Sequence, residues 1–365
     1  MAFLTGLILV DAPASALNNA GADENARTEN AVATKFIRSR QGALPYVSAQ
    51  AFRYWLRTTL ERDASVGWRA APVFREQKVA YTDANPLEWW DDDLFGYMRA
   101  QSKRADAVAK RAADVGRANE TPTTTDITRV SPFRVSTLVS IAPVPLVSDF
   151  GTMSRHDGDP VPHEHQFYRA VLKGLLSLDL HAAGTFSYRN RTGYRNLDDT
   201  RRAIAEKRGL NHLELEQSFR LPDEERAQRV SVLLRALGIL GGGAKQAIHY
   251  TDVTPVVVLA MVTRGGNNPL QYVVGSDASG TLKVHAEGLT EMVRVWGDQV
   301  MSPLYVGWVQ GFHDDEQQRL TAALDGLSAD EARPRLPQRY VLGHPREALA
   351  QLADAVATNA SIWLA

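Results

Sequence analysis

Residues 47–61, which read VSAQAFRYWLRTTLE, predict the helix from which the fold assignment starts. Ser48 is the expected N-cap, because its hydroxyl can accept a hydrogen bond from a backbone amide of the first helical turn. At 100° per residue the apolar side chains share one arc, namely Ala49, Phe52, Trp55, Leu56 and Leu60. A neighbouring arc, about 60° wide, holds Gln50, Arg53 and Arg57. The sequence therefore predicts a helix with a basic stripe beside its buried face.

The segments on either side of this helix alternate between strand and helix patterns. Buried strands are expected at 3–10, 136–144 and 163–180, a helix at 225–240 that ends in the glycines 241–243, and a β-branched strand at 254–264. We expect this last strand to form a hairpin with residues 270–276. The order strand, helix, two strands, helix, strand is typical of an α+β, ferredoxin-like domain (βαββαβ), the scaffold of RNA-recognition domains. Further elements follow in the pattern: a strand at 281–287, a helix at 288–300, a strand at 303–309 and two helices that end near residue 358.

Three stretches interrupt this pattern. Residues 12–31 have no periodicity and are expected to form a loop. Residues 66–134 pass from an acidic, Trp-rich segment to a basic helical one and a Thr/Pro linker, so we expect an inserted module. Residues 188–224 are polar and basic, with too few apolar side chains for a core unit. The main domain then comprises residues 1–65, 135–187 and 225–365.

The composition is that of a soluble globular protein, with 44% hydrophobic residues, a net charge of −1 and no cysteine. The lack of cysteine excludes disulfides and thiol nucleophiles and fits a reducing compartment. No run approaches the roughly 18 apolar residues of a membrane span, so we expect a cytoplasmic protein. Charge is nevertheless uneven, with six basic residues to one acidic at 35–62, six to two at 99–117 and seven to three at 189–208.

These basic stretches suit phosphate groups. Lys35, Arg38 and Arg40, with the helix residues Gln50, Arg53 and Arg57, would present five cations and an amide to a phosphate backbone. A solvated helix face is the alternative interpretation.

Two further segments are candidates for the same role. The loop GGGAKQ, residues 241–246, lets backbone amides approach a phosphate, with Lys245 and Gln246 to complete the contact, although a glycine helix cap explains the glycines equally well. It lacks the spacing of a nucleotide-hydrolysing P-loop. In the third basic stretch, Tyr188 and Tyr194 could wedge against bases, with a plain surface loop as the alternative.

Signals for an enzyme are weaker. His163 and His165 would face the same side of a strand, which permits a metal pair, but no third ligand stands at a recognised spacing and RNA binding requires neither. Asp91, Asp92 and Asp93 are expected to solvate a turn. No nucleophile elbow, dinucleotide-binding fingerprint or kinase motif set is found. The sequence favours a binding protein without catalytic residues.

Several motifs, taken together, resemble the DevR branch of the Cas seven family, the backbone subunits of type I-B CRISPR surveillance complexes (Cascade) in the RAMP superfamily. They span residues 3–265 in order: LNN (17–19), KFIRSR (35–40), YVSAQAFRYWLR (46–57), DDDLFGYM (91–98), TRVSPFRVSTLVSI (128–141), DFG (149–151), AGTFSYR (183–189), LLRALGILGGGAKQ (233–246) and TPVVVLAMV (254–262). The last hundred residues add little to the resemblance.

The resemblance implies a hand-shaped protein with an RNA-recognition-like palm, fingers from residues 66–134 and a thumb hairpin from 188–224. Such subunits stack head to tail along one guide RNA (crRNA) as a helical filament. They hold the RNA by its backbone and present it for pairing with target DNA in an R-loop. The RNA-binding residues it implies are Asn18, Lys35, Arg38, Arg40, Ser48, Gln50, Arg53, Arg57, Arg129, Arg134, Arg191, Arg195, Lys245 and Gln246.

The resemblance also implies partners and roles for them. They are the crRNA, target DNA through the guide, further copies of this chain, Cas five-, six- and eight-type subunits, and a separate effector nuclease or transposition proteins. No cofactor, metal or membrane is implied, and the role is antiviral defence or its transposon-linked counterpart. Three alternatives stay open: an RNA-cleaving backbone subunit of the type III kind using Asp23 or Glu24, an autoregulatory nucleic-acid-binding protein, and a metal-dependent hydrolase built on His163 and His165.

Overall fold

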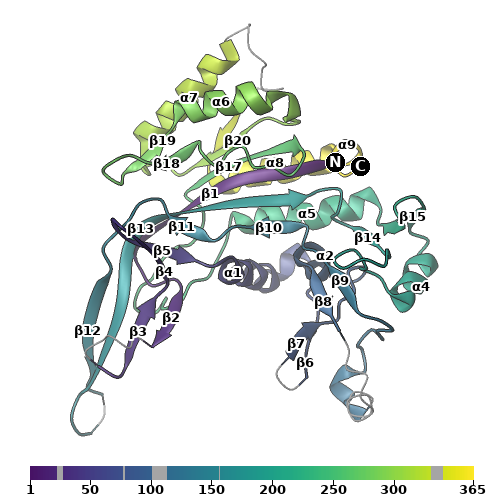
Figure 1. Cartoon of the computed structure of the whole chain (residues 1–365), viewed down its shortest axis with the longest axis horizontal. Coiled ribbons are helices and arrows are strands. Elements are labelled where there is room, and N and C mark those ends of the chain that lie inside the picture. The colour runs from purple at the N-terminus through teal and green to yellow at the C-terminus, as the bar shows by residue number, and fades with distance from the viewer. Residues whose placement is uncertain (23–27, 77–78, 101–112, 156, 330–339) are drawn as a thin grey trace.

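The computed structural model describes residues 1–22, 28–76, 79–100, 113–155, 157–329 and 340–365. Its centre is a large sheet that contains the predicted palm (Figure 1). The palm follows the chain through β1 (Ala2–Ser15), α1 (Ala49–Arg62), β10 (Phe133–Val135) with β11 (Leu138–Ser140), β13 (Val161–Asp179), α5 (Asp223–Leu237) and β17 (Val257–Arg264). The strand order is β17-β1-β13-β11, and all of these neighbours are antiparallel. This is the ferredoxin-like order, so the predicted α+β fold class is confirmed.

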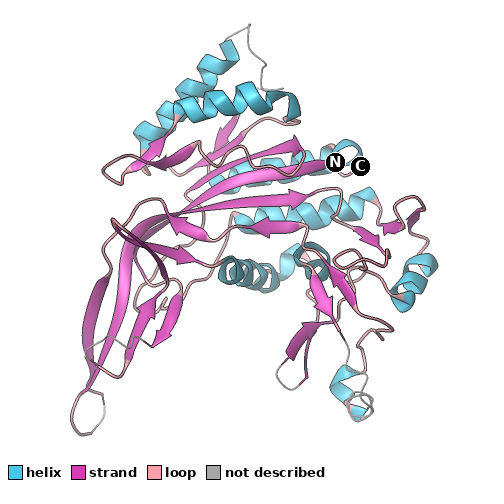
Figure 2. Ribbon diagram, in the orientation of Figure 1, coloured by secondary structure: helices cyan, strands magenta, loops and turns pink. Residues whose placement is uncertain are grey.

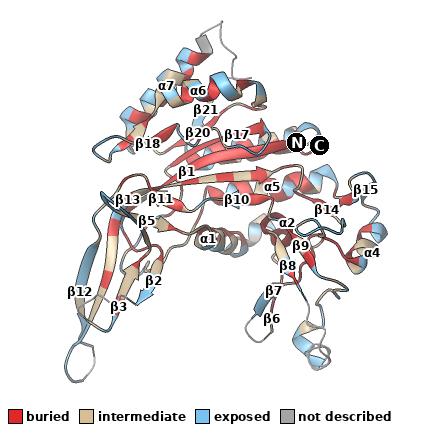
Figure 3. Cartoon of the chain, viewed as in Figure 1, coloured by how far each residue is buried: buried red, intermediate tan, exposed pale blue. Residues whose placement is uncertain are grey.

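Both faces of the sheet are covered around β1. On one side Leu4, Ile8 and Val10 pack in a core with α1, α5 and α8 (Pro345–Thr358). On the other side Leu7 and Leu9 pack in a second core formed with the C-terminal elements. The alternation follows from the two-residue period of a strand, and a strand buried on both faces reads as a continuous apolar run. Figure 3 shows β1 and β17 buried along their length.

The C-terminal elements extend and cover the sheet. They are β18 (Val274–Ser276), β19 (Leu282–Val284), α6 (Ala286–Trp296), β20 (Tyr305–Trp308), α7 (Asp314–Ala329), β21 (Val341–Gly343), α8 and α9 (Ala360–Trp363). β20 pairs with β17, and β21 continues the sheet beyond β20. The predicted hairpin between 254–264 and 270–276 is wrong: β18 pairs with β19, because β1 and β20 already occupy both edges of β17.

One arm extends from the palm where β1 ends. It consists of the N-terminal half of β13 with β12 (Val147–Met153), β2 (Asn19–Ala22) and β3 (Ala31–Thr34). Next to it, β4 (Phe36–Ser39) and β5 (Gly42–Val47) form a hairpin that joins the central sheet through β11. The expectation of a loop at 12–31 is therefore wrong in part. Its short strands gain their hydrogen bonds from distant β13, which a local pattern does not reveal.

A second arm holds residues of the two predicted insertions. Its elements are β6 (Val73–Glu76), β7 (Val79–Thr82), α2 (Trp90–Phe95), β8 (Tyr97–Arg99), β9 (Ile127–Arg129), β14 (Thr185–Ser187), α4 (Asp199–Lys207), β15 (Asn211–Leu213) and β16 (Ser218–Arg220). Short strands and turns dominate this arm, and α1 is seen between the two arms (Figures 1 and 2).

Residues 188–224 do take part in a core, contrary to the expectation from their polar composition. Leu197, Phe219 and Leu221 pack with Leu87 and Phe186. The apolar partners come from outside the segment, so the composition of the segment alone underestimates its burial. The basic residues between 101 and 112 lie outside the described residues. Among the residues that are described, no helix has both the length and the apolar character needed to cross a membrane.

Candidate nucleic-acid interface

Helix α1 forms as its sequence predicts. Ser48 caps it, with its side chain accepting a hydrogen bond of 3.3 Å from the amide of Ala51. The buried face consists of Phe52, Trp55, Leu56, Thr59 and Leu60, which matches the predicted apolar arc except that Ala49 is only partly buried. This packing fixes the direction in which the neighbouring basic stripe points.

The basic stripe is only partly available to a ligand. Arg53 donates to the carbonyl oxygens of Phe95 and Phe133 and to the Ser131 hydroxyl, so it fastens α1 to the second arm. Its guanidinium carbon lies 5.1 Å from the centre of the Phe95 ring, and that of Arg57 lies 4.3 Å from the same ring. Burial, and then the charge of Arg57, lower the pKa of Arg53 to about 10.

The predicted role of Arg53 as a phosphate ligand is therefore corrected to a structural one. Burial also lowers the pKa of Arg57, which the nearby Asp91 and Asp92 oppose. Asp91 and Asp92 are about thirty-five positions away in the chain, so the local charge count at 35–62 did not include them. Gln50, at the start of the stripe, is exposed.

Asp91, Asp92 and Asp93 are buried, contrary to the expectation of a solvated turn. Asp93 accepts hydrogen bonds from Arg129, from Arg229 at 2.8 Å and from the amide of Gly184. Asp91 accepts from the amide of Ala71 at 2.7 Å. Asp93 therefore connects α2 to β9, α5 and the chain after β13, so it holds the second arm on the palm.

Arg129 does not belong to an RNA-binding surface. Its side chain is only 3% exposed and, besides Asp93, donates to the Thr185 carbonyl at 2.9 Å and to the Asn196 side chain at 3.0 Å. Arg99, Arg201, Arg226 and Arg229 are likewise buried and bonded within the protein. A buried charge must be paired, and these arginines satisfy that requirement.

A different set of cations is accessible. Lys35 is partly exposed just before β4, and Arg38 and Arg40 are exposed on the β4–β5 hairpin. The Arg38 guanidinium carbon lies 5.9 Å from the centre of the Phe36 ring, on the same face of the strand. Within the described part of the chain none of the three forms an ion pair. Their charge is available to an anionic ligand.

Arg134 and the predicted thumb meet at one hollow. A cavity of about 380 Å³ is lined by Arg134, Arg189, Tyr194 and His181, among others. Tyr194 is 47% exposed, with the Arg191 guanidinium carbon 4.8 Å from its ring centre, so it can still meet a base. Arg195 donates to the side chain of Asn190 at 3.3 Å.

Tyr188 has no such freedom. Its ring packs against Phe219 and His212, and its hydroxyl hydrogen-bonds the His212 ring at 2.9 Å. The prediction that Tyr188 wedges against bases is therefore wrong.

The glycine-rich loop lies against α1 and the end of β1. A Cβ on Gly242 would come within 2.3 Å of Trp55 Cγ, so only glycine allows this approach. The Ala244 amide donates to the Leu17 carbonyl at 3.1 Å, which sets Lys245 beside Asn18 in space. Asn18 is 9% exposed, and its Nδ2 finds no hydrogen-bond partner among the described residues.

The side chain of Gln246 forms hydrogen bonds inside this loop and holds it closed. Its side-chain amide donates to the carbonyls of Gly242 and Thr251 and accepts from the Thr251 amide at 2.9 Å. With both ends of its amide occupied, the prediction of Gln246 as an RNA ligand is corrected to a loop-closing role. Lys245 is partly exposed and has a left-handed backbone conformation with φ of 56°.

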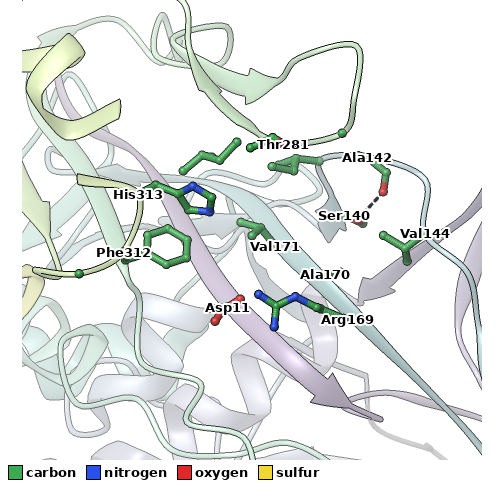
Figure 4. A pocket seen from close by; sticks show the side chains of 14 residues that line it. Asp11, Ser140, Ala142, Val144, Arg169, Ala170, Val171, Thr281, Phe312 and His313 are labelled. Carbon is green, nitrogen blue, oxygen red and sulfur yellow. Dashed lines mark hydrogen bonds between the residues drawn. The ribbon is translucent and has the colours of Figure 1, made fainter. Parts of the chain in front are cut away.

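Figure 4 shows a second hollow, of about 600 Å³, between the sheet and the C-terminal elements. Asp11 on β1, Arg169 on β13, and Phe312 and His313 before α7 line it. Burial raises the pKa of Asp11, and the charges of Arg169 and His313 oppose that shift. With an acidic group beside its cations, this hollow is a poorer match for a polyanion than the β4–β5 hairpin is.

His163 and His165 do face the same side of β13, as predicted, with ring centres 6.1 Å apart. Among the residues that the structure describes, no three His, Asp or Glu side chains are arranged to hold a metal ion. Asp23 and Glu24, the carboxylates of the type III alternative, lie outside the described residues.

The chain matches no protein-family model, and no curated protein matches it in sequence. Solved structures of similar arrangement exist. One is a "CRISPR RNA-guided surveillance complex", with 13% identity, a TM-score of 0.45, and coverage of 97% of this chain and 99% of that chain. Another is a "CRISPR RNA-guided surveillance complex, pre-nicking", with 13% identity, a TM-score of 0.44, and coverage of 98% and 100%.

Proposed function

We propose that this chain is a crRNA-binding backbone subunit of a CRISPR surveillance complex, of the type I-B, Cas seven kind, and that it has no catalytic activity of its own. It would bind the sugar-phosphate backbone of the guide RNA and leave base edges free for pairing with target DNA. The proposal combines the sequence motifs described above with a ferredoxin-like palm and with the accessible cations Lys35, Arg38 and Arg40 of the β4–β5 hairpin, which precedes α1.

The observation that carries the proposal is the division of the cations into two sets. Arg129, Arg226 and Arg229 are buried and bonded inside the protein. Lys35, Arg38 and Arg40 are accessible and form no ion pair within the described part of the chain. Cations kept without a carboxylate partner suit a polyanion, because each can replace a counterion on a phosphate.

The covered sheet explains why we place the RNA at the hairpin and not on the sheet. RNA-recognition domains stack bases on an open sheet face. Here the C-terminal elements lie on that side of β1, and Lys173 on β13 donates to the carbonyls of Gln271 and Val274 at 3.1 and 3.0 Å. Contacts from the palm edge to the backbone would accept any guide sequence.

Assembly along the RNA is part of the proposal. The arm of β12 and β13 carries exposed Asp149, Asp157 and Asp159. The second arm, at the opposite end of the view in Figure 1, carries exposed Arg189 and Arg191. Contacts between these aspartates of one copy and these arginines of the next would run head to tail, and contacts of that kind that do not close produce a filament.

The test is to purify the untagged chain from cells that carry its neighbouring genes and a CRISPR array, and to analyse the bound nucleic acid. We expect RNA of defined lengths with a constant repeat-derived end and several protein copies on each RNA. Replacing Lys35, Arg38 and Arg40 together with glutamine should strongly reduce the amount of RNA that co-purifies. A matched triple replacement of the exposed Arg264, Arg294 and Arg346 should not. Recovery of a closed oligomer on one DNA site would contradict the proposal and favour the regulator.

A further inference from the structure

A column of aromatic rings runs along β13 next to the glycine-rich loop. His163, His165 and Phe167 alternate along the strand and share one face. His249, from the loop, packs against two of them, with ring centres 4.8 Å from His165 and 5.0 Å from Phe167. The opposite strand makes room for the column at Gly151, where a Cβ would come within 2.7 Å of His163 Nε2.

Three ring nitrogens of this column are buried without a hydrogen-bond partner in the part of the chain that the structure describes. His165 is 6% exposed, and neither of its ring nitrogens has a hydrogen-bond partner among the described residues. The same holds for Nε2 of His249. Asp149 Oδ2 lies 3.5 Å from His165 Nε2 without forming a hydrogen bond. Buried polar atoms are normally satisfied, and several unsatisfied ones together indicate a missing partner.

Other unsatisfied groups adjoin the column. Asn18 Nδ2 and Thr34 Oγ1 are buried without a partner in the described part of the chain. Backbone contacts bring these groups together: the Lys35 amide donates to the Asn18 carbonyl at 2.9 Å, and the Thr34 amide donates to the Gln166 side chain at 3.3 Å. The chain after β1, the end of β3 and the glycine-rich loop thus lie beside the N-terminal half of β13.

We propose that His165, His249, Lys245 and Asn18 form a subsite for a backbone phosphate of the bound RNA, and that filling it takes up a proton. The inference rests on the proposed function and adds a chemical property to it, and it replaces the expectation from the sequence that RNA binding does not require His165. A phosphate would accept from Lys245 and Asn18 and from one imidazolium, which supplies the partner that these donors lack.

The charges around His165 define the sign of the effect. Burial is the largest influence on the pKa of His165 and lowers it, and the charge of His249 is the second and also lowers it. Asp149 on β12 opposes this shift, whereas Lys245 on the loop and His163 on the same strand add to it. These influences together favour the neutral ring in the free protein. A phosphate beside it favours the charged form, so the pKa rises on binding. RNA affinity must then strengthen as pH falls through the interval between the two pKa values.

The experiment measures the affinity of the full chain for a single-stranded RNA of mixed sequence between about pH 6 and pH 8, the range in which histidines titrate. We expect affinity to rise by up to about tenfold for each unit of falling pH. His249→Gln, which is partly exposed, should flatten this dependence. His285→Gln, a partly buried histidine in the C-terminal region, should leave it unchanged. Lys245→Gln should weaken binding at every pH.

Proton NMR of the histidine rings provides a second readout that does not depend on folding of a His165 variant. The pKa of His165 should rise when RNA is added. If RNA binds with the same pH dependence in wild type and His249→Gln, the subsite is wrong while the proposed function stands. If no RNA binds at any pH, the proposed function itself fails. If inorganic phosphate alone raises the pKa and RNA does not, the site binds a free anion and the inference is overturned.

Discussion

Arg129 and Asp93 form an ion pair in which the side chains are only 3% and 0% exposed. Asp93 also binds Arg229 of α5, so one carboxylate joins the second arm to the palm. Breaking one partner of such a network leaves an uncompensated buried charge, which is far more costly than losing a surface pair. The cations of this protein therefore act in two ways, some as internal connections and others as ligands.

Arg129→Ala should lower the free energy of unfolding by about 3–5 kcal/mol, because Asp93 loses a buried partner. Arg134→Ala, at an exposed position five residues further on, should change stability little and weaken RNA binding. Urea denaturation and RNA titration of both variants test this pair. Equal loss of RNA affinity by folded Arg129→Ala would contradict the structural assignment.

Removing the charges of Lys35, Arg38 and Arg40 should weaken RNA binding and its dependence on salt. Each phosphate contact on a single strand contributes about 0.7 to the slope of log affinity against log salt, so the slope should fall by about 2. Fluorescence anisotropy at several salt concentrations measures it. An unchanged slope would mean that these residues do not contact phosphates. The thermal midpoint should stay near that of wild type, since none of the three is buried.

Arg53→Ala should destabilise the protein by about 2–3 kcal/mol, because the Phe95 and Phe133 carbonyls lose a charged donor. Gln50→Ala, one helical turn earlier and exposed, should stay within about 0.5 kcal/mol of wild type. Chemical denaturation compares the two. If Arg53→Ala is as stable as wild type but no longer binds RNA, Arg53 is a phosphate ligand and its structural assignment is wrong.

The stability should depend on pH through Asp92. Burial, and then the charge of Asp91, raise the pKa of Asp92 to about 7. Between the unfolded pKa of 3.8 and this value the folded state holds a proton that the unfolded state has lost, so stability falls as pH rises through that window. The side chain of Asp92→Asn cannot ionise, so the variant does not lose stability in this way as the pH rises. Its free energy of unfolding relative to that of wild type should therefore increase from about pH 5 to pH 8. A constant difference across urea melts would show that Asp92 is ionised throughout.

Gly242→Ala should displace the glycine-rich loop, because the added Cβ would meet Trp55 at 2.3 Å. We expect weaker RNA binding together with a changed fluorescence of Trp55. At Gly241 the nearest atom would lie 3.9 Å away, so Gly241→Ala is a matched control that should behave as wild type. Equal RNA affinity of the two variants would show that the loop position is not needed for binding.

Local periodicity in the sequence was sufficient to predict several helices and strands of this protein. It predicted α1 with its Ser48 cap and apolar arc, the buried strands β1, β13 and β17, and helix α5, because side-chain spacing reports directly on which face of an element is buried. From the order of these elements the ferredoxin-like palm followed.

Contacts between residues that are distant in the chain could not be predicted from these patterns and are known from the structure alone. From the sequence we expected a solvated turn at Asp93 and an RNA-binding role for Arg129. Both residues are buried because α2, β9 and α5 converge. The pairing of β18 with β19, the bonds that occupy Arg53 and Gln246, and the approach of His249 to His165 have the same origin. A local pattern encodes exposure along one element, whereas these contacts depend on how the elements pack against each other in three dimensions.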